Sequence, residues 1–237
     1  MTRLQTSFYC ASLLSLACHG GAAPVQEAAG HNILTEAEVR AGWRMLFDGE
    51  STSGWRVYMT DGMSDGWQVE EGALTRVGNG GDIITEDKFE SFELQLEWQI
   101  APGGNSGIMY HVIEGPRAPY ETGPEMQVLD NVAHHDGLDL LTSAGACYGL
   151  YLPSRDVTRP AGEWNAVRLV IDRGHVEHWL NGTLLCSFDL WSDDWNSRVE
   201  ASKFKEWPLF GKARSGHISL QDHGDRVAYR NIKLRSL

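Results

Sequence analysis

The segment EMQVLD at residues 125–130 carries polar side chains in an order that suits the floor of a cleft. Its alternation predicts a strand with Glu125 and Gln127 on one face, about 6.6 Å apart along the chain. A retaining glycosidase needs two carboxyl groups about 5–5.5 Å apart. Here the second position is an amide, and Asp130 faces away unless a bulge intervenes. Conventional double displacement is therefore poorly supported, and a solvated surface strand is the plain alternative for Glu125.

A second group of reactive side chains lies in GHISLQDHGD at residues 216–225. Gln221 is on one face of a predicted strand, and Asp222 and His223 follow where that strand must turn. An Asp beside a His can hold the imidazole in one tautomer and tune its basicity for proton transfer near neutral pH. The alternative is a turn in which Asp222 accepts backbone hydrogen bonds and His223 is exposed.

The segment PGGNSGIMY at residues 102–110 places Asn105 between glycines. Glycine permits positive φ and a close approach of the backbone to a ligand. Asn105 is therefore expected to present its amide from a tight turn between two strands. A plain hairpin loop would explain the same glycines.

An aromatic, charge-mixed insertion spans residues 190–211 and contains Trp191, Trp195 and Trp207. Flat aromatic faces stack on the C–H surfaces of sugars, and Lys203 could reach a cleft to stabilise developing negative charge. The favoured interpretation for most of these tryptophans is that they pack on the body of the protein.

Histidines and carboxylates also gather at His134, His135, Asp130 and Asp136. Their spacing matches no strong metal-ligand motif, so a histidine-rich loop is the favoured interpretation. No P-loop, GxSxG, HExxH or dinucleotide fingerprint is present in the sequence. The sequon NGT at residues 181–183 is read as a hairpin turn between two strands.

The elements that must position these residues are strands. The segment FELQLEWQI at 92–100 alternates apolar and polar residues without a break. Shorter runs of the same kind, separated by turn signals such as DG, DRG and NG, are WRVYM (55–59), WQVEEGALTRV (67–77), SGIMYHVIE (106–114), EMQVL (125–129), YGLYLP (148–153), AVRLVI (166–171), VEHWL (176–180), HISLQ (217–221) and VAYRNIKL (227–234).

About ten to a dozen such strands predict an all-β protein of two packed antiparallel sheets. One short helix is expected after Thr35, because Thr35 and Glu38 form a capping box. An antiparallel sheet can leave one face wet, so polar residues on long strands are either ordinary surface or the floor of a groove.

The N-terminal residues and the net charge limit the cellular location and the partners that we expect. Residues 1–23 have the pattern of a signal peptide, residues 24–33 of a flexible tether, and residues 34–237 of one β-sandwich domain. We therefore expect export to the periplasm or the outside of the cell, with Cys18 as a possible site of lipid anchoring. The apolar run is too short for a transmembrane helix. A formal charge of -12 disfavours nucleic acid as a partner. Cys147 and Cys186 could pair or remain two buried thiols.

The ordered motifs LFDG, FELQLEW, PGGNSGI, EMQVLD, YGLY, PAGEWN, LNG and GHISLQDHGDRVAYRNIKL resemble the 3-keto-disaccharide hydrolase family. That family is also described as a 3-keto-glucoside 1,2-lyase and 3-keto-2-hydroxy-glucal hydratase domain. The resemblance covers residues 43–237. It implies a concanavalin A-like jelly-roll sandwich in an exported protein that acts on oxidised sugars, downstream of a sugar 3-oxidase.

This resemblance would explain the missing second carboxylate. A ketone at sugar C3 acidifies the proton on C2, so a base can remove that proton and expel the C1 substituent by β-elimination. Water then adds to the 2-hydroxy-glucal. One base, one acid and a group that stabilises charge at the C3 oxygen suffice for this chemistry.

The motif matches place most of the candidate residues in the family's signature, with Lys203 outside the strongest matches, and their individual roles are our hypothesis. His223, oriented by Asp222, and Glu125 are the expected acid–base pair. A divalent metal ion could replace Lys203 in stabilising the enediolate, with ligands unassigned. The expected contacts to sugar hydroxyls and to the rim of the site come from Asn105, Gln127, Gln221, Tyr148 and Lys203.

Two other functions fit the same pattern. A non-catalytic carbohydrate-binding module could use the same sheet face and tryptophans, since fold does not fix function. A glucanase of related fold would cleave unoxidised glycosides, although the Glu125–Gln127 pair disfavours it. Binding without turnover would support the first, and release of reducing ends from ordinary glucans the second.

Overall fold

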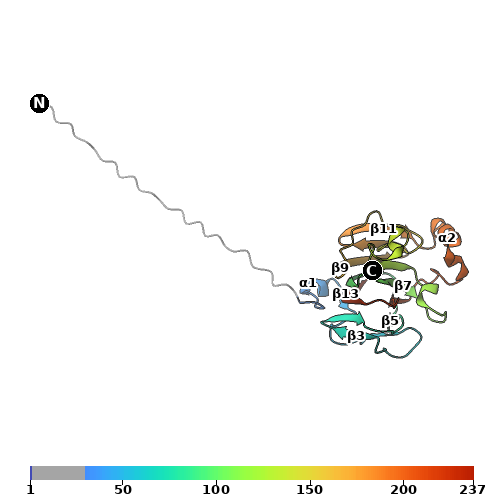
Figure 1. The fold of residues 1–237 in the computed structure, drawn as a ribbon, viewed down its shortest axis with the longest axis horizontal. Helices are drawn as coiled ribbons and strands as arrows, with labels where there is room; N and C mark the ends of the chain where they lie inside the picture. Colours follow the sequence, from blue (N-terminus) through green and yellow to red (C-terminus); the bar gives the residue numbers. More distant parts are fainter. Residues whose placement is uncertain (2–29) are drawn as a thin grey trace.

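The computed structural model describes Met1 and residues 30–237, so the expected signal peptide, with Cys18, and most of the tether lie outside the described residues. The described residues form thirteen strands with short helical segments between them (Figure 1). The strands are β1 (Arg44–Met45), β2 (Trp55–Val57), β3 (Trp67–Glu70), β4 (Ala73–Arg76), β5 (Ile83–Thr85), β6 (Phe92–Ile100), β7 (Asn105–Val112), β8 (Glu125–Leu129), β9 (Asn165–Asp172), β10 (His175–Leu180), β11 (Thr183–Asp189), β12 (His217–Leu220) and β13 (Val227–Ser236).

The strands pair into two antiparallel sheets. One has the order β11-β10-β9-β6-β13-β4-β3, with β1 paired to β13, and the other has the order β2-β5-β12-β7-β8. Strands distant in the sequence are neighbours in both sheets, and one continuous apolar core joins them. This is the predicted fold class, a concanavalin A-like jelly-roll sandwich.

Strand β6 shows how the sequence pattern builds the sandwich. Phe92, Leu94 and Trp98 are buried in the core, as are the other alternate residues of the strand. Glu93 lies on the opposite face, where Arg168 Nε donates to it at 2.6 Å and Arg235 Nη2 at 2.6 Å. The polar face is thus held by charge pairs across β6, β9 and β13, because these strands are neighbours in the sheet.

Two hairpins confirm the turn predictions. β9 and β10 are joined by Arg173 and Gly174, and β10 and β11 by Asn181 and Gly182, all with positive φ. A two-residue turn of this kind matches the twist of the flanking strands. The sequon NGT is therefore a hairpin turn followed by β11, as its pattern predicts.

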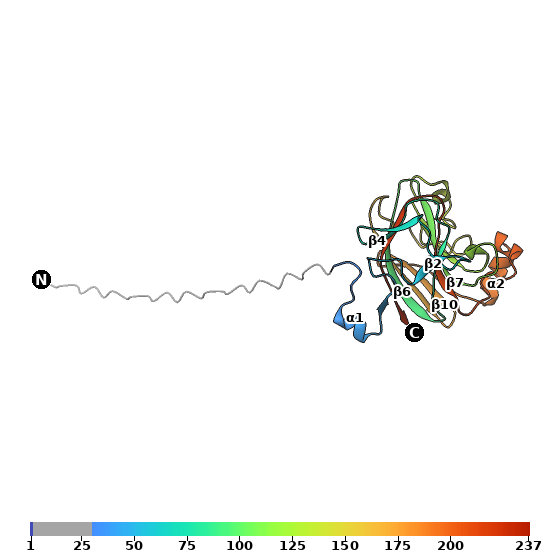
Figure 2. The same ribbon diagram turned by 90° about the horizontal axis from the view of Figure 1, so that it is seen from below.

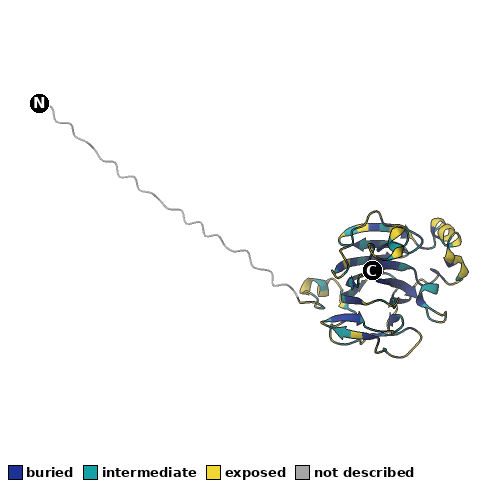
Figure 3. Cartoon of the chain, in the orientation of Figure 1, coloured by how far each residue is buried: buried dark blue, intermediate teal, exposed yellow. Residues whose placement is uncertain are grey.

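Helices flank the sandwich at opposite sides (Figures 1 and 2). α1 (Glu36–Arg40) begins at Thr35, whose capping box with Glu38 is present as predicted. α2 (Asp193–Glu200) and three 3-10 turns, η1 (Pro119–Glu121), η2 (His135–Leu138) and η3 (Lys203–Glu206), complete the elements. Figure 3 shows that exposed residues gather on α1 and α2 while buried ones follow the strands.

Three local predictions were wrong. The run 148–153 is not a strand: residues 148–150 form a turn, and Tyr151 makes only an isolated bridge to Cys147. Residues 193–200, expected in a loop, form α2, because Ser192 caps the helix by accepting from Trp195 N. The end of the tether is not free: Asn32 exchanges two hydrogen bonds with Asn231 and donates a third to Gly72 O.

The structure also bears on the cysteine pairing and on membrane-spanning helices. Cys147 and Cys186 are both free thiols, so the pairing that the sequence left open is not formed. Among residues 30–237, no helix is both long and apolar enough to span a bilayer.

One buried histidine makes the fold sensitive to acid. His178 is fully buried, with Nδ1 3.1 Å from Gly145 O and Nε2 3.2 Å from the Tyr110 hydroxyl. Burial lowers the pKa of His178 to about 4 from 6.5. Between pH 6.5 and pH 4, the unfolded chain therefore binds a proton at His178 that the folded chain does not bind. The contribution of His178 to stability is fully present above pH 6.5 and is lost as the pH falls toward 4.

We expect this histidine to cost on the order of 2–3 kcal/mol of unfolding free energy between pH 7 and pH 4.5. Urea denaturation of the wild type and of His178→Gln at both pH values measures the effect. The variant should lose less stability on acidification than the wild type. An equal loss in both proteins would show that His178 is not the titrating group.

Candidate active site

The outer face of the five-stranded sheet carries the residues that the sequence singled out. Ile84, Ser219, Met109 and Glu125 are successive partners across β5, β12, β7 and β8, and therefore share one face. Ile84 and Met109 belong to a small apolar cluster separate from the main core, which identifies this face as the outer one. The strand period of two places a second row on the same face, made of Asp82, Gln221, Gly107 and Gln127.

A pocket of about 340 Å³ lies over these rows. It contains seven of the eight residues predicted for the site, and its lining is Asn105, Tyr120, Glu125, Gln127, Asp136, Tyr148, Lys203, Phe204, Trp207, Gln221 and His223. These residues come from β7, β8, the end of β12, the segments around η1, η2 and η3, and the turn at residues 148–150. Asp222 alone among the predicted residues is absent from the lining.

Glu125 reaches the pocket across a glycine. A Cβ atom added at Gly107 would lie 1.9 Å from Oε1 of Glu125, so the carboxyl group occupies the space that any other side chain would fill. Within the described part of the chain, no hydrogen bond acts on this carboxyl. The sequence signal for this contact was a glycine inside a strand pattern, which often marks a close approach.

The surroundings of Glu125 favour its neutral form. Burial, with the negative charges of Asp82 and Asp136 and against the opposing charge of the Lys203 ammonium, raises the pKa of Glu125 to about 8. At neutral pH this carboxyl therefore holds a proton that it can donate, which is the property of a general acid.

Asp222 does not orient His223, contrary to the prediction. Its Oδ1 accepts from Arg76 Nε at 2.6 Å and from the Gly224 amide at 3.0 Å. Its Oδ2 accepts from the amides of Gly80 at 2.7 Å and Gly81 at 2.9 Å. Burial disfavours the charge, but these donors outweigh it and hold the pKa of Asp222 below its ordinary value.

The carboxylate of Asp222 is thus fully used in fixing the turn before β5, and no hydrogen bond joins it to His223 among residues 30–237. The alternative reading of this segment, a turn with Asp222 accepting backbone hydrogen bonds and an exposed His223, is the one observed. His223 nevertheless lines the pocket, with its ring centroid 6.4 Å from that of His134.

Two amides at the floor of the pocket have unused hydrogen-bonding capacity. Asn105 and Gln127 are 3% and 2% exposed, and neither Oδ1 of Asn105 nor Oε1 of Gln127 has a partner within the described residues. Buried polar atoms are usually paired, so these two oxygens are suited to accept hydrogen bonds from ligand hydroxyl groups. Asn105 is the first residue of β7 rather than part of a turn, so its position is more rigid than predicted.

One wall of the pocket carries a cation and a phenol. Lys203 Nζ lies 4.5 Å from the centre of the Tyr148 ring. Burial, together with the negative charges of Asp136 and Glu125, raises the pKa of Tyr148 to about 12. The Tyr148 hydroxyl is therefore a proton-bearing donor at neutral pH.

The adjoining part of the pocket is aromatic, since Phe204 follows Lys203 in η3. The ring centroids of Tyr120 and Trp207 are 5.2 Å apart, and those of Phe204 and Trp207 are 5.7 Å apart. Trp195 is fully buried and Trp191 donates from Nε1 to Gly211 O, so both pack on the body as favoured, whereas Trp207 lines the pocket. Tyr120 was missed because a single tyrosine in a loop carries no signal.

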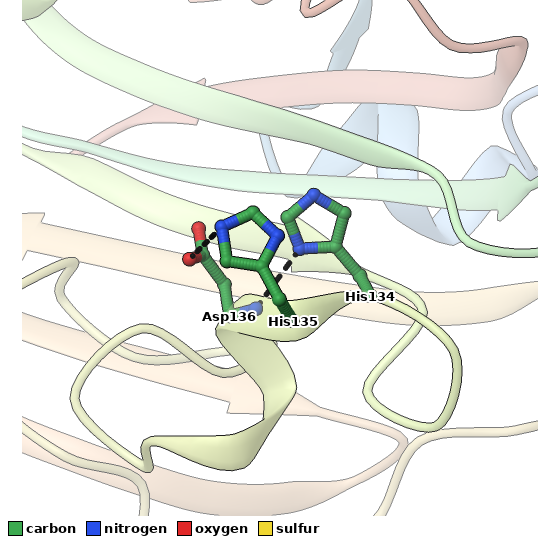
Figure 4. A group of neighbouring side chains, drawn as sticks. All are labelled: His134, His135 and Asp136. Atoms are coloured by element: carbon green, nitrogen blue, oxygen red, sulfur yellow. Dashed lines mark hydrogen bonds and ion pairs between the residues drawn. The ribbon is translucent and has the colours of Figure 1, made fainter.

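Three consecutive residues at the mouth could hold a metal ion. His134, His135 and Asp136 offer donor atoms within 4.8 Å of one another. Figure 4 shows the His135 ring between the His134 ring and the Asp136 carboxylate, with His135 Nε2 3.0 Å from Asp136 Oδ1. Two imidazoles and one carboxylate suit several divalent transition metals, so this donor set fits such an ion. Asp130 is not part of the group, since its carboxylate accepts from the amides of Gly103 and Val132.

Comparison with known proteins places the chain in a family. A 3-keto-disaccharide hydrolase of Bacteroides thetaiotaomicron is 35% identical over 189 residues, which are 70% of this chain and 65% of that protein. A crystal structure from Parabacteroides distasonis, provisionally described as a glycosyl hydrolase, matches with a TM-score of 0.83 and 37% identity over 88% of this chain and 100% of that one.

A second such structure from the same species has a TM-score of 0.66 and 25% identity over 82% of this chain and 99% of that one. Residues 42–235 match the model of the 3-keto-alpha-glucoside-1,2-lyase-like domain. These matches confirm the resemblance drawn from the sequence motifs, and the chain belongs to the family of 3-keto-alpha-glucoside-1,2-lyase-like domains.

Proposed function

We propose that this protein cleaves 3-keto-glucosides by β-elimination followed by hydration. The observation that carries the proposal is one pocket, in a chain of this family, that combines a proton-bearing carboxyl, an exposed imidazole and two unpartnered buried amides. The relative from Bacteroides thetaiotaomicron supports the substrate class through its name, 3-keto-disaccharide hydrolase.

In the elimination step, His223 accepts the proton from C2, which the C3 ketone has acidified. The electron pair of the C2–H bond first forms a C2–C3 double bond, which places the negative charge of an enediolate on the C3 oxygen. The C3 ketone then re-forms, and the same electron pair forms the C1–C2 double bond as the C1–O bond breaks. Glu125 donates its proton to the departing oxygen, so the aglycone leaves as an alcohol. Lys203 is the donor available to the charge that develops at the C3 oxygen, because the Tyr148 hydroxyl already contacts Asp136.

In the hydration step the same two residues exchange roles. The Glu125 carboxylate accepts a proton from water as the water oxygen bonds to C1. The ring of His223 is exposed and exchanges its proton with water, so the imidazolium returns a solvent proton to C2. Both residues regain their starting states, and the sum of the two steps is hydrolysis without a covalent sugar–protein bond.

The two sides of the pocket would divide the substrate between them. Asn105, Gln127 and Gln221 are suited to the hydroxyl groups of the oxidised ring. The wall of Tyr120 and Trp207 offers apolar faces to the ring of the aglycone. A divalent ion held by His134, His135 and Asp136 would act as a Lewis acid toward a substrate oxygen.

Two wider expectations belong to the same proposal. The substrate must come from an enzyme that oxidises C3 of a glucoside, a sugar 3-oxidase. Residues 1–23 have the pattern of an export signal, so we propose that the protein acts in the periplasm or outside the cell, with Cys18 as its candidate lipid anchor.

The experiment compares a 3-keto-glucoside with its unoxidised parent, each with and without a chelator. We expect free aglycone and enone-type absorbance from the oxidised sugar alone. Binding without release would support the carbohydrate-binding alternative. Release of the aglycone from the unoxidised glucoside would support a conventional glycosidase. Asp136 supplies a second carboxyl in the pocket for such a reaction. However, His135 and the Tyr148 hydroxyl already contact this carboxyl.

Gly107 provides a test of the Glu125 position. In Gly107→Ala the new Cβ forces the Glu125 carboxyl to move. We expect kcat/KM on the 3-keto-glucoside to fall roughly tenfold to a hundredfold, because small displacements of a catalytic group are costly. Gly62→Ala is the matched control, since a Cβ there meets nothing within 4 Å. Equal rates for the two variants would show that the observed place of the carboxyl does not matter.

A further inference from the structure

Asp82 is an acidic residue on the pocket face that the reaction described above does not use. It directly precedes β5, and Ile83 and Ile84 pair with Leu220 and Ser219 of β12. The strand period puts its side chain on the face of Ile84, in the row that continues through Gln221 and Gly107. The Gln221 amide donates to Gly107 O at 3.0 Å, which holds this row together.

Glu125 points into the same row. Its carboxyl fills the space above Gly107, which is separated from Asp82 by the single strand β12. Two strand spacings are about 9.6 Å between backbones, and both side chains shorten that separation. Burial raises the pKa of the Tyr229 phenol, and the negative charges of Glu125 and Asp82 raise it as well.

Asp82 is held rigidly in this position. Its Oδ1 accepts from the Asp222 amide at 2.8 Å. The Asp222 carboxylate in turn binds the amides of Gly80 and Gly81 and the guanidinium of Arg76. Asp222, expected to orient His223, thus fixes the turn that carries Asp82 instead.

The charges around Glu125 are few. Asp82 and Asp136 are negative, and Lys203 is positive but stacks on the Tyr148 ring. Arg76 is paired with Asp222, and His223 is exposed. The pKa values of the three neighbouring neutral groups, Tyr148, Tyr229 and Cys147, are all raised by burial.

We propose that Asp82 is a positioning residue that keeps Glu125 protonated at neutral pH and thereby makes it the acid of the reaction. This inference rests on the proposed function. Burial raises the pKa of Asp82 only to about 6, so Asp82 is ionised at pH 7 while Glu125, at about 8, is not. The buried carboxylate of Asp82 and the acid it controls thus have separate roles.

The first test is the pH profile of kcat/KM on a 3-keto-glucoside. Asp82→Asn keeps an oxygen for the Asp222 amide but removes the charge. We expect the alkaline limb to move down by roughly one pH unit, with a severalfold loss at pH 8 and little loss at pH 6. Glu86→Gln, an exposed acid at the other end of β5, should leave the profile unchanged. A purely structural Asp82 would lower the rate equally at every pH and overturn the proposal.

The second test needs no substrate. The pKa of Glu125 is higher in the folded than in the unfolded protein. The contribution of its protonated form to the unfolding free energy is therefore fully present below pH 4.5 and is lost as the pH rises to about 8. Thermal unfolding across this range is compared for the wild type, Asp82→Asn, Glu125→Gln and the double variant. Asp82 itself titrates near pH 6, so the comparison is made above pH 7, where its own titration is nearly complete. In that range Asp82→Asn should lessen the loss only when Glu125 is present.

The two tests separate the two claims. If no protein turns over the 3-keto-glucoside, the proposed function fails and the unfolding cycle alone decides the role of Asp82. An effect of Asp82→Asn that is the same with and without the Glu125 carboxyl would show that the two groups are uncoupled and would overturn the inference.

Discussion

Replacing Glu125 by Gln should lower kcat on a 3-keto-glucoside by about a thousandfold, since a positioned general acid contributes roughly 10² to 10⁴. The amide fills the same space above Gly107 but has no acidic proton for the leaving oxygen. KM should change little, because the group acts mainly in the transition state. Steady-state kinetics with aglycones of different leaving ability measures the effect, which should be smallest for the most acidic aglycone.

The same variant is not expected to unfold. Glu125→Gln removes a carboxyl whose ionisation the folded state opposes, so stability above pH 8 should rise rather than fall. Activity within a few-fold of the wild type in a folded Glu125→Gln protein would remove Glu125 from the mechanism.

Replacing His223 by Ala should also reduce kcat by about 10² to 10³, because the proton on C2 would lose its base. His223 is exposed, so the melting temperature should remain close to that of the wild type. Added imidazole should restore part of the rate in this variant and not in Glu125→Gln. His175→Ala, at an exposed position on β10, is the control for loss of a histidine.

Exchange at C2 separates the two variants further. His223→Ala should fail to exchange the C2 proton with solvent, whereas Glu125→Gln should still exchange it while releasing the aglycone slowly. If His223→Ala exchanges C2 at the wild-type rate, another group is the base.

The sequence predicted the sheet and most of the pocket because period two is a local property. Glu125 and Gln127 of β8 alternate with core residues, and Gln221 follows β12 with the same phase. Side chains of one phase on neighbouring strands reach one face, whatever the strand order. The sequence could therefore assign Glu125, Gln127 and Gln221 to one site without the knowledge that β12 lies between β5 and β7.

The predictions that failed depend on contacts between distant segments. Asp222 is adjacent to His223 in sequence, but its carboxylate accepts hydrogen bonds from the amides of Gly80 and Gly81, which lie 142 and 141 residues earlier in the chain. The role proposed for Asp82, which the sequence did not suggest, likewise follows from pairing between β5 and β12, which no local pattern encodes. The segment 148–153 alternates like a strand, yet its turn is set by Gly149, whose φ is 70°.

Asp136 shows a third kind of contact that sequence reasoning could not place. Its sequence position beside His134 and His135 indicates a loop residue. In the structure its side chain lines the pocket beside Tyr148. It gives the pocket a second carboxyl besides Glu125, so carboxyl count alone does not separate elimination from ordinary glycoside hydrolysis. The fate of the C2 hydrogen does separate them.

Cleavage of a 3-keto-glucoside in D₂O tests the central claim most directly. Elimination and hydration place a solvent hydrogen on C2, so the released sugar should carry deuterium there from the first turnover. Free 3-keto-glucose incubated under the same conditions corrects for spontaneous exchange. Aglycone release at the full rate with the original hydrogen retained on C2 would mean that the glycosidic bond is cleaved without proton removal, and the account would be wrong.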